Sequence, residues 1–163
     1  MNIDKIVFPP SDWVPNNPRL PVLIYRNALP KRRASDGFEM LFASNEWTHI
    51  WRNGVFKYQH YHCEAHEVLG IGKGRATLLI GGPDGREVDV VRGDCLILPA
   101  GTGHMNMECS SDFEVVGGYP PGQRADIQTS SPSREMLSRI SELPVPDTDP
   151  VQGSSGPLMT AWR

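Results

Sequence analysis

The chain has 163 residues, a formal net charge of −3 at pH 7, 39% hydrophobic residues and 21% charged residues. This length accommodates one domain with a sizeable core, and the slightly acidic balance gives no basic surface for nucleic acid or an anionic membrane. No run approaches the ~20 apolar residues of a membrane span, and the first residues lack the profile of a secretory signal. We therefore expect one cytoplasmic domain that binds neither nucleic acid nor a membrane.

The N-terminal part, residues 1–50, predicts an arm and a few short elements. Residues 1–20 are rich in Pro and Asn and favour an extended arm, followed by a strand at 22–25. Asn27 is able to cap one helical turn, and an apolar stripe predicts a helix at 36–43.

The central part, residues 51–119, consists of short apolar runs separated by turn residues such as Gly81-Gly82 and Gly93-Asp94. Turn signals at this spacing are typical of a β-sandwich or a small barrel, and the 16 Gly and 15 Pro agree with an all-β chain. The predicted strands lie at 55–62, 67–71, 76–80, 87–91, 95–98, 104–109 and 113–116.

The C-terminal part, residues 120–163, predicts one amphipathic helix and a tail. Ser131 before Pro132 is a helix start signal, and the helix ends before Pro144. The tail keeps Leu158 and Trp162, so we expect it to wrap over the domain or over a neighbouring subunit; fraying is the alternative.

Three histidines and one carboxylate in the central part have spacings that suit a metal site. His60 and His62 are one residue apart, so on a strand both imidazoles point to the same face. A turn at 63–66 returns Glu67 to that cavity, and His104 begins a later strand. Such a donor set suits one divalent ion of Fe, Mn, Ni, Co or Zn, and leaves positions free on a six-coordinate ion.

Each signal has a simpler alternative. A pair such as His60 and His62 alone is more often exposed or packed; the addition of Glu67 and His104 favours metal binding. His66 could replace a ligand, but its parity relative to Glu67 directs it out of the cavity, which favours packing.

Strand parity adds candidates around the predicted metal. Phe56 and Tyr58 share the face of His60, and Asn106 and Glu108 share that of His104. We expect Phe56 and Asn106 to line the substrate pocket, and Glu108 and Tyr58 to handle protons.

The three cysteines form no C-x-x-C pair, and their odd number argues against a disulfide framework. Cys95 and Cys109 lie in apolar strand patterns and are expected to pack. Cys63 lies next to His62, but on the opposite parity, which argues against a ligand or redox role.

The two halves of this pattern resemble the two motifs of the cupin superfamily. The motif G-x5-H-x-H-x4-E-x6-G is matched by Gly54, His60, His62, Glu67 and Gly74, and G-x5-P-x-G-x2-H by Gly93, Pro99, Gly101 and His104. The second motif continues to an Asn where this chain has Glu108. Segments such as His66-Glu-Val-Leu-Gly70 and Leu98-Pro-Ala-Gly101 are similar to segments of the uncharacterised bacterial YjlB-like cupins.

The resemblance implies a single cupin domain over 1–163: a jelly-roll β-sandwich or small barrel, with one metal ion bound by His60, His62, Glu67 and His104. It also implies a homodimer. Because cupins host many reactions, three hypotheses stay open. The first is a metal-dependent enzyme, a dioxygenase-type oxidoreductase or an isomerase or lyase, that acts on a small polar chelating substrate. The second is a non-catalytic module that binds or senses a small ligand through its metal. A metal that only braces the fold is a third.

Overall fold

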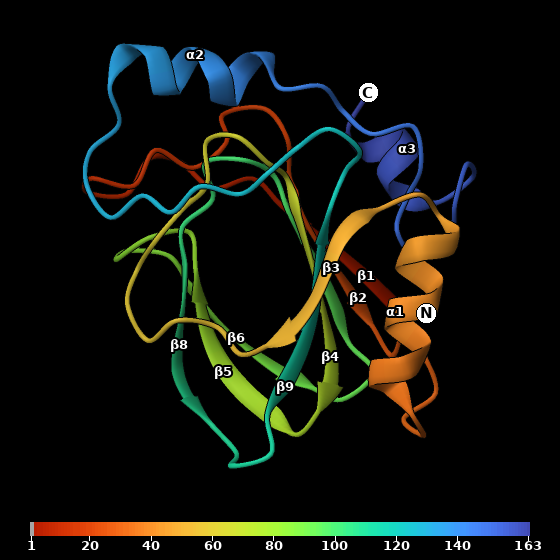
Figure 1. Cartoon of the computed structure of the whole chain (residues 1–163). Coiled ribbons are helices and arrows are strands. Elements are labelled where there is room, and N and C mark those ends of the chain that lie inside the picture. The colour runs from red at the N-terminus through yellow and green to blue at the C-terminus, as the bar shows by residue number, and fades with distance from the viewer. Residues whose placement is uncertain (1) are drawn as a thin grey trace.

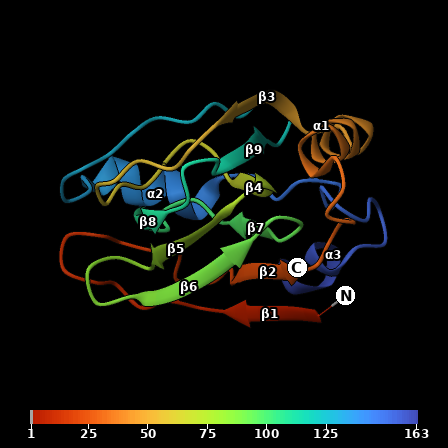
Figure 2. The same cartoon turned by 90° about the horizontal axis from the view of Figure 1, so that it is seen from below.

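The computed structural model describes residues 2–163, which fold into two antiparallel sheets packed face to face (Figures 1 and 2). The larger sheet has the order β1 (Asn2–Ile6), β2 (Val22–Arg26), β7 (Cys95–Leu98), β4 (Glu67–Lys73), β9 (Glu114–Tyr119) and β3 (Thr48–Asn53). The smaller sheet has the order β6 (Arg86–Val91), β5 (Arg75–Ile80) and β8 (His104–Cys109). The helices are α1 (Ala34–Ser44), α2 (Arg134–Glu142) and α3 (Pro157–Ala161). The predicted all-β jelly-roll sandwich is confirmed.

The space between the sheets is filled by aliphatic side chains that alternate along each strand. Leu69 and Ile71 of β4 lie in the same buried cluster as Leu78 and Ile80 of β5. Because strand side chains alternate, Glu67 points to the same inner face as Leu69 and Ile71. The fold therefore places a carboxylate at one end of the sandwich interior.

The outer face of the larger sheet is covered by α1, which confirms the predicted helix (Figure 1). Two glycines of β4 allow this close packing. A Cβ built on Gly70 would lie 2.6 Å from the Phe38 ring, and one on Gly72 would lie 1.9 Å from Oγ of Ser35. Since β4 is covered on both faces, every residue from Glu67 to Gly72 is buried.

The C-terminal part packs back on its own chain. Helix α2 lies across one end of the sandwich (Figure 1), and its N-cap is Ser133 instead of the predicted Ser131. Trp162 is 1% exposed, and its indole N–H donates to the Pro21 carbonyl at 2.9 Å. The tail is therefore an ordered arm over the domain, with a second short helix, α3, that the sequence did not predict.

Three other predictions fail locally. Residues 55–62 are not a continuous strand, because the backbone there makes only isolated bridges at His60 and Tyr61. The expected N-terminal arm begins with a strand, β1, at the edge of the larger sheet. Asn27 does not cap a helical turn; it has a φ of 53°, and its backbone N–H donates to the Asp94 carboxylate at 2.9 Å.

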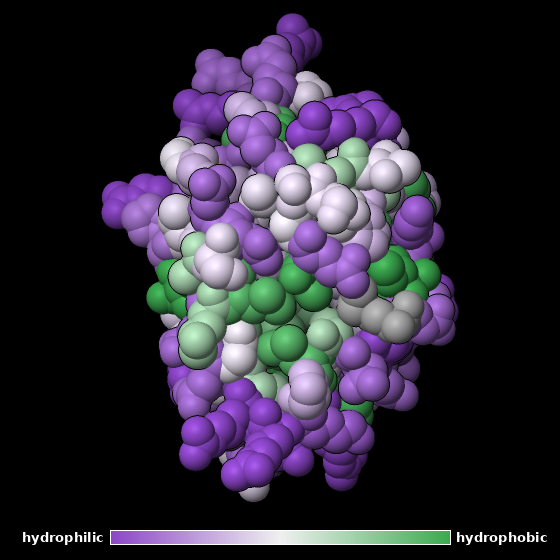
Figure 3. Space-filling view, turned by 90° about the vertical axis from the view of Figure 1, so that its right-hand side faces the viewer, coloured by the Kyte–Doolittle hydropathy of each residue, from purple (hydrophilic) through white to green (hydrophobic). Residues whose placement is uncertain are grey.

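The face at the right of Figure 1, where α1 and the chain ends lie, carries apolar side chains across its middle and hydrophilic ones above and below (Figure 3). Within residues 2–163, no helix is long and apolar enough to cross a membrane.

Candidate metal centre

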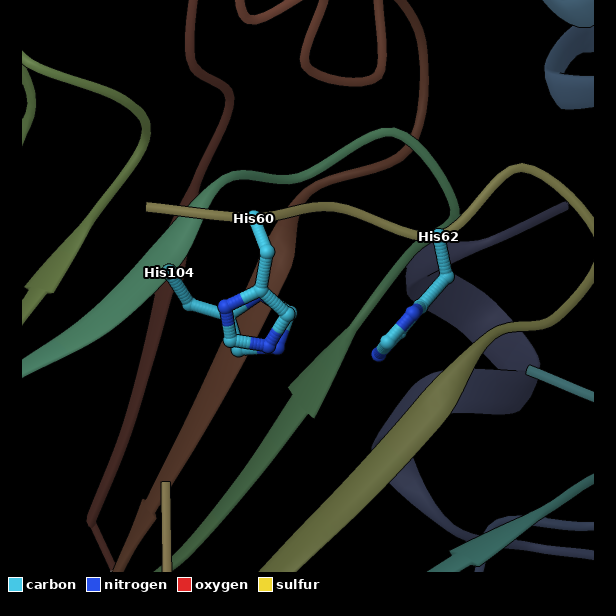
Figure 4. Close-up of side chains that lie close together, drawn as sticks. All are labelled: His60, His62 and His104. Carbon is cyan, nitrogen blue, oxygen red and sulfur yellow. The ribbon is translucent and has the colours of Figure 1, made fainter. Parts of the chain in front are cut away.

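The three predicted histidines lie together at one end of the sandwich (Figure 4). Their candidate ligand atoms are all within 4.8 Å of one another, and all three side chains are buried. The ring centroids of His60 and His104 are 4.1 Å apart, and those of His62 and His104 are 5.2 Å apart. Residues 44 positions apart in the chain thus meet as one cluster of imidazoles.

Backbone bridges on both sides fix the segment that carries His60 and His62. His60 and His104 exchange backbone hydrogen bonds of 3.2 and 2.9 Å, and Tyr61 exchanges two with Gln128. Tyr61 is fully buried, and its hydroxyl donates to the Ser130 carbonyl at 2.5 Å. The local alternation of an extended chain therefore holds around Tyr61, although no continuous strand forms.

Each imidazole is oriented through its Nδ1 atom by a backbone carbonyl. His60 Nδ1 lies 3.0 Å from the Tyr58 carbonyl oxygen, and His104 Nδ1 lies 2.9 Å from that of Thr102. His62 Nδ1 contacts the carbonyl oxygen of Asp126. A carbonyl only accepts, so each Nδ1 carries the proton and each neutral ring keeps a lone pair on Nε2. This is the arrangement that prepares an imidazole to bind a metal through Nε2.

The Glu67 carboxylate completes the cluster. Its Oε1 lies 3.2 Å from His104 Nε2 and 3.4 Å from His62 Nε2. Burial alone would raise the pKa of Glu67, but in the absence of a metal the charge of a protonated His62 holds it below its usual range. Burial lowers the pKa of His62, yet Glu67 raises it overall.

The Glu67 carboxylate adds a negative charge to the three imidazoles, and the cluster has too little positive charge to balance it. Burial and the charge of His104 lower the pKa of His60 to about 3, so this ring stays neutral. Three Nε2 lone pairs and one carboxylate converge on a buried space, and acceptors alone repel one another. The residues present fit a divalent cation with nitrogen and oxygen ligands.

The sequence predictions missed Tyr119, which lies near Glu67, and Trp51, which contacts Tyr119. Tyr119 accepts a hydrogen bond from the Trp51 indole at 2.9 Å. Burial and the charge of Glu67 raise the pKa of Tyr119. The predicted last strand ended at 116, whereas β9 continues to Tyr119 beside β4. Gly117 makes room for the indole, since a Cβ there would lie 2.1 Å from the Trp51 ring.

A cavity of about 320 Å³ adjoins the cluster. It is lined by Trp51, Asn53, Gly54, Val55, Phe56, His60, His62, Glu67, Leu69, His104, Tyr119, Ala125 and Ile127. Phe56 is part of this lining and lies edge-on to His60 with a centroid separation of 5.2 Å. Tyr58 stacks on Phe56 at 4.9 Å but is not part of the lining. Asn106 is buried and also does not line the cavity; its backbone N–H donates to the Phe56 carbonyl at 2.9 Å.

Glu108 is not on the face of His104, so this expectation was wrong. Thr77 of β5 pairs with Glu108, but the next residue, Leu78, pairs with Asn106. Met107 is therefore an extra residue in β8, a β-bulge that reverses the alternation beyond it. His104 and Asn106 are buried, whereas Met107 and Glu108 are exposed. Glu108 lies in a surface depression with Arg75 and Asp89, away from the histidines.

His66 packs outside the cluster, as parity predicted. Its Nδ1 accepts the Ala100 N–H at 2.9 Å, and its ring lies 4.8 Å from that of Trp162. Burial lowers the pKa of His66 to about 4.

The three cysteines are free thiols. Cys95 is buried as expected, and Cys63 is buried under α2 beside Ile140. Cys109, the last residue of β8, is exposed, contrary to its predicted packing role.

The jelly-roll sandwich and the two motifs that supply His60, His62, Glu67 and His104 define a cupin. No family model matches the chain. It is 34% identical to the uncharacterised protein YjlB of Bacillus subtilis (strain 168) over 157 residues. The alignment covers 95% of this chain and 93% of YjlB. The chain therefore belongs to the family of YjlB.

Two solved structures are similar in part. A DUF861 family protein from Thermotoga maritima is 18% identical with a TM-score of 0.39, covering 60% of this chain and 98% of that one. Acireductone dioxygenase from Bacillus anthracis, with a cadmium ion in its active centre, is 20% identical with a TM-score of 0.40, covering 60% of this chain and 76% of that one.

Proposed function

We propose that this cupin binds one divalent transition-metal ion through His60, His62, His104 and Glu67. The observation that carries the proposal is that all three Nδ1 atoms contact backbone carbonyls, which leaves three Nε2 lone pairs directed with a carboxylate into one buried space. Imidazole and carboxylate ligands suit Fe, Mn, Co, Ni or Zn.

We infer further that the protein is a metal-dependent enzyme acting on a small molecule that chelates the ion. A bound ion would supply Lewis acidity or, if iron, a site for dioxygen activation. Four protein ligands leave positions free on a six-coordinate ion, and the cavity of about 320 Å³ beside them has room for a substrate. A dioxygenase-type oxidoreductase and an isomerase or lyase are both compatible with this set.

The residues around the metal ligands have separate roles in this proposal. Trp51 donates to Tyr119, and the Tyr119 hydroxyl holds a proton beside Glu67, where it orients the carboxylate. Phe56 forms a wall that limits the entry of water. Tyr58 is 46% exposed and outside the lining, so Tyr119 is the better candidate for proton handling near the ion.

One observation favours the second candidate function, a non-catalytic binding module. Apart from the four proposed ligands, Tyr119 is the one ionisable side chain among the described residues of the lining, and Glu108 lies elsewhere. A site with so few groups for proton transfer is also consistent with a module that captures a ligand on its metal.

Elemental analysis tests the shared basis of both functions. Protein purified without added metal should contain about one first-row transition ion per chain, and His62→Ala should lose it while circular dichroism shows the fold intact. Absence of any ion, and no uptake on titration, would reject the proposal.

Oxygen consumption by the Fe(II)-loaded protein over a panel of chelating compounds would then separate a dioxygenase from the other reactions.

The homodimer implied by the family resemblance is also a proposal. The apolar side chains on the face shown in Figure 3 support it. Light scattering should give twice the chain mass of 18.1 kDa.

A further inference from the structure

The cavity beside the metal ligands has almost no charge. Of the lining residues within 2–163, Glu67 is the one acidic side chain, and none is Lys or Arg. Glu67 itself is directed at His62 and His104. A ligand carboxylate or phosphate beyond the metal would therefore meet no cationic partner in the lining.

Most polar groups of the lining are already engaged. The Asn53 side-chain oxygen accepts the backbone N–H of Gly54 at 2.8 Å, so its amide NH2 group is what Asn53 offers a ligand. The Trp51 indole N–H is used by the Tyr119 hydroxyl, which in turn faces Glu67. Little remains to hydrogen-bond a substrate, apart from the proposed metal.

The walls and the mouth are apolar. Val55, Leu69 and Ile127 line the cavity together with the rings of Phe56 and Trp51. Phe56 is 45% exposed and Ile127 is 52% exposed, so apolar side chains border the mouth of the cavity. Apolar walls with few polar groups are typical of sites that bind the apolar body of a small molecule.

We propose that the substrate is an uncharged small molecule with a flat, apolar body and a chelating end, such as two adjacent hydroxyl groups. This inference rests on the proposed metal site, because the chelating end needs the ion. A volume of about 320 Å³ limits the body to roughly one ring system. A charged group on the far end of that ring would lose its hydration against Val55, Phe56 and Ile127 without gaining an ion pair.

A matched pair of probes tests this charge selection. 4-Methylcatechol and 3,4-dihydroxybenzoate share the ring and the chelating hydroxyls, and differ in a methyl group or a carboxylate at the far end. Calorimetric titration of the Zn(II)-loaded protein without oxygen should give a dissociation constant for 4-methylcatechol at least about tenfold lower than for 3,4-dihydroxybenzoate.

A charge introduced at the mouth should reverse the preference. Ile127→Lys supplies a cation to the cavity, and should strengthen binding of 3,4-dihydroxybenzoate several-fold while weakening that of 4-methylcatechol. Leu137→Lys is the matched control, because Leu137 is a similarly exposed aliphatic residue at 47% but lies on α2, outside the cavity lining. It should leave both dissociation constants unchanged.

The outcomes separate this inference from the metal proposal. Equal affinities, tighter binding of 3,4-dihydroxybenzoate, or no binding of either probe by protein that holds zinc would overturn the uncharged, apolar class and leave the metal site standing. Failure to bind zinc in a separate titration would overturn both.

Discussion

Oε1 of Glu67 lies 3.2 Å from Nε2 of His104, although each atom is an acceptor when the neutral ring has its proton on Nδ1. Two buried acceptors remain this close only with a cation or a proton between them. Without a metal, a proton shared between Glu67 and His62 relieves part of this repulsion, in agreement with the lowered pKa of Glu67 and the raised pKa of His62.

Glu67→Gln keeps the shape of the side chain and removes its charge. We expect this variant to bind Zn(II) or Co(II) with an affinity lowered about 100-fold. Even residues that only hydrogen-bond to the metal ligands contribute about 10- to 100-fold to metal affinity. Competition with a chromophoric chelator measures the affinity. An unchanged affinity would show that the carboxylate is not a ligand.

Tyr119→Phe tests the positioning role of the hydroxyl beside Glu67. The change removes the hydroxyl that lies near the Glu67 carboxylate and leaves the Trp51 indole N–H without its acceptor. We expect about tenfold weaker metal binding and an altered visible spectrum of the Co(II)-loaded protein, with the fold retained. Tyr58→Phe is the control, because Tyr58 lies outside the cavity lining, and it should change neither readout.

Glu108→Gln should leave metal affinity and probe binding unchanged, because Glu108 is exposed on the far side of the bulge in β8. The binding assays used for Glu67→Gln measure both. A loss in either would mean that the strand re-registers when metal binds, so that Glu108 turns inward.

The bulge also shows which part of the site could be predicted from the sequence. The spacing of His60 and His62 is a local property, and alternation around Tyr61 preserved it even where the predicted strand was absent. Glu108 depends on a register shift between β5 and β8, which is set by tertiary pairing and leaves no clear mark in the sequence. Tyr119 was missed for a similar reason, since its neighbour Glu67 lies on another strand, 52 positions away.

The thiols should react in an order set by burial. Burial and the charge of Asp126 raise the pKa of Cys63 to about 12, and burial raises that of Cys95. A raised thiol pKa lowers the thiolate fraction at pH 8, and the thiolate is the reactive form. Native protein should therefore show one fast thiol, Cys109, with Ellman's reagent, and three in guanidinium chloride. A second fast thiol would contradict the burial of Cys63.

The tail is anchored by a buried carboxylate, Asp149, which is 0% exposed. It accepts the Tyr25 hydroxyl and the backbone N–H groups of Val151 and Leu158, the latter two at 2.7 and 3.0 Å. Asp149 and Tyr25 are 124 positions apart, so the apolar residues Leu158 and Trp162 indicated an ordered tail but not its anchor.

Asp149→Ala would leave these donors buried without an acceptor, and we expect the free energy of unfolding to fall by about 3 kcal/mol. Asp147→Ala is the matched control, because its side chain is 99% exposed and its oxygen lies 3.9 Å from Arg163. That change should cost less than about 0.5 kcal/mol. Urea unfolding followed by tryptophan fluorescence measures both, and Trp162 additionally reports release of the tail from Pro21. Equal losses in the two variants would show that the tail is held by its apolar contacts, with Asp149 contributing little.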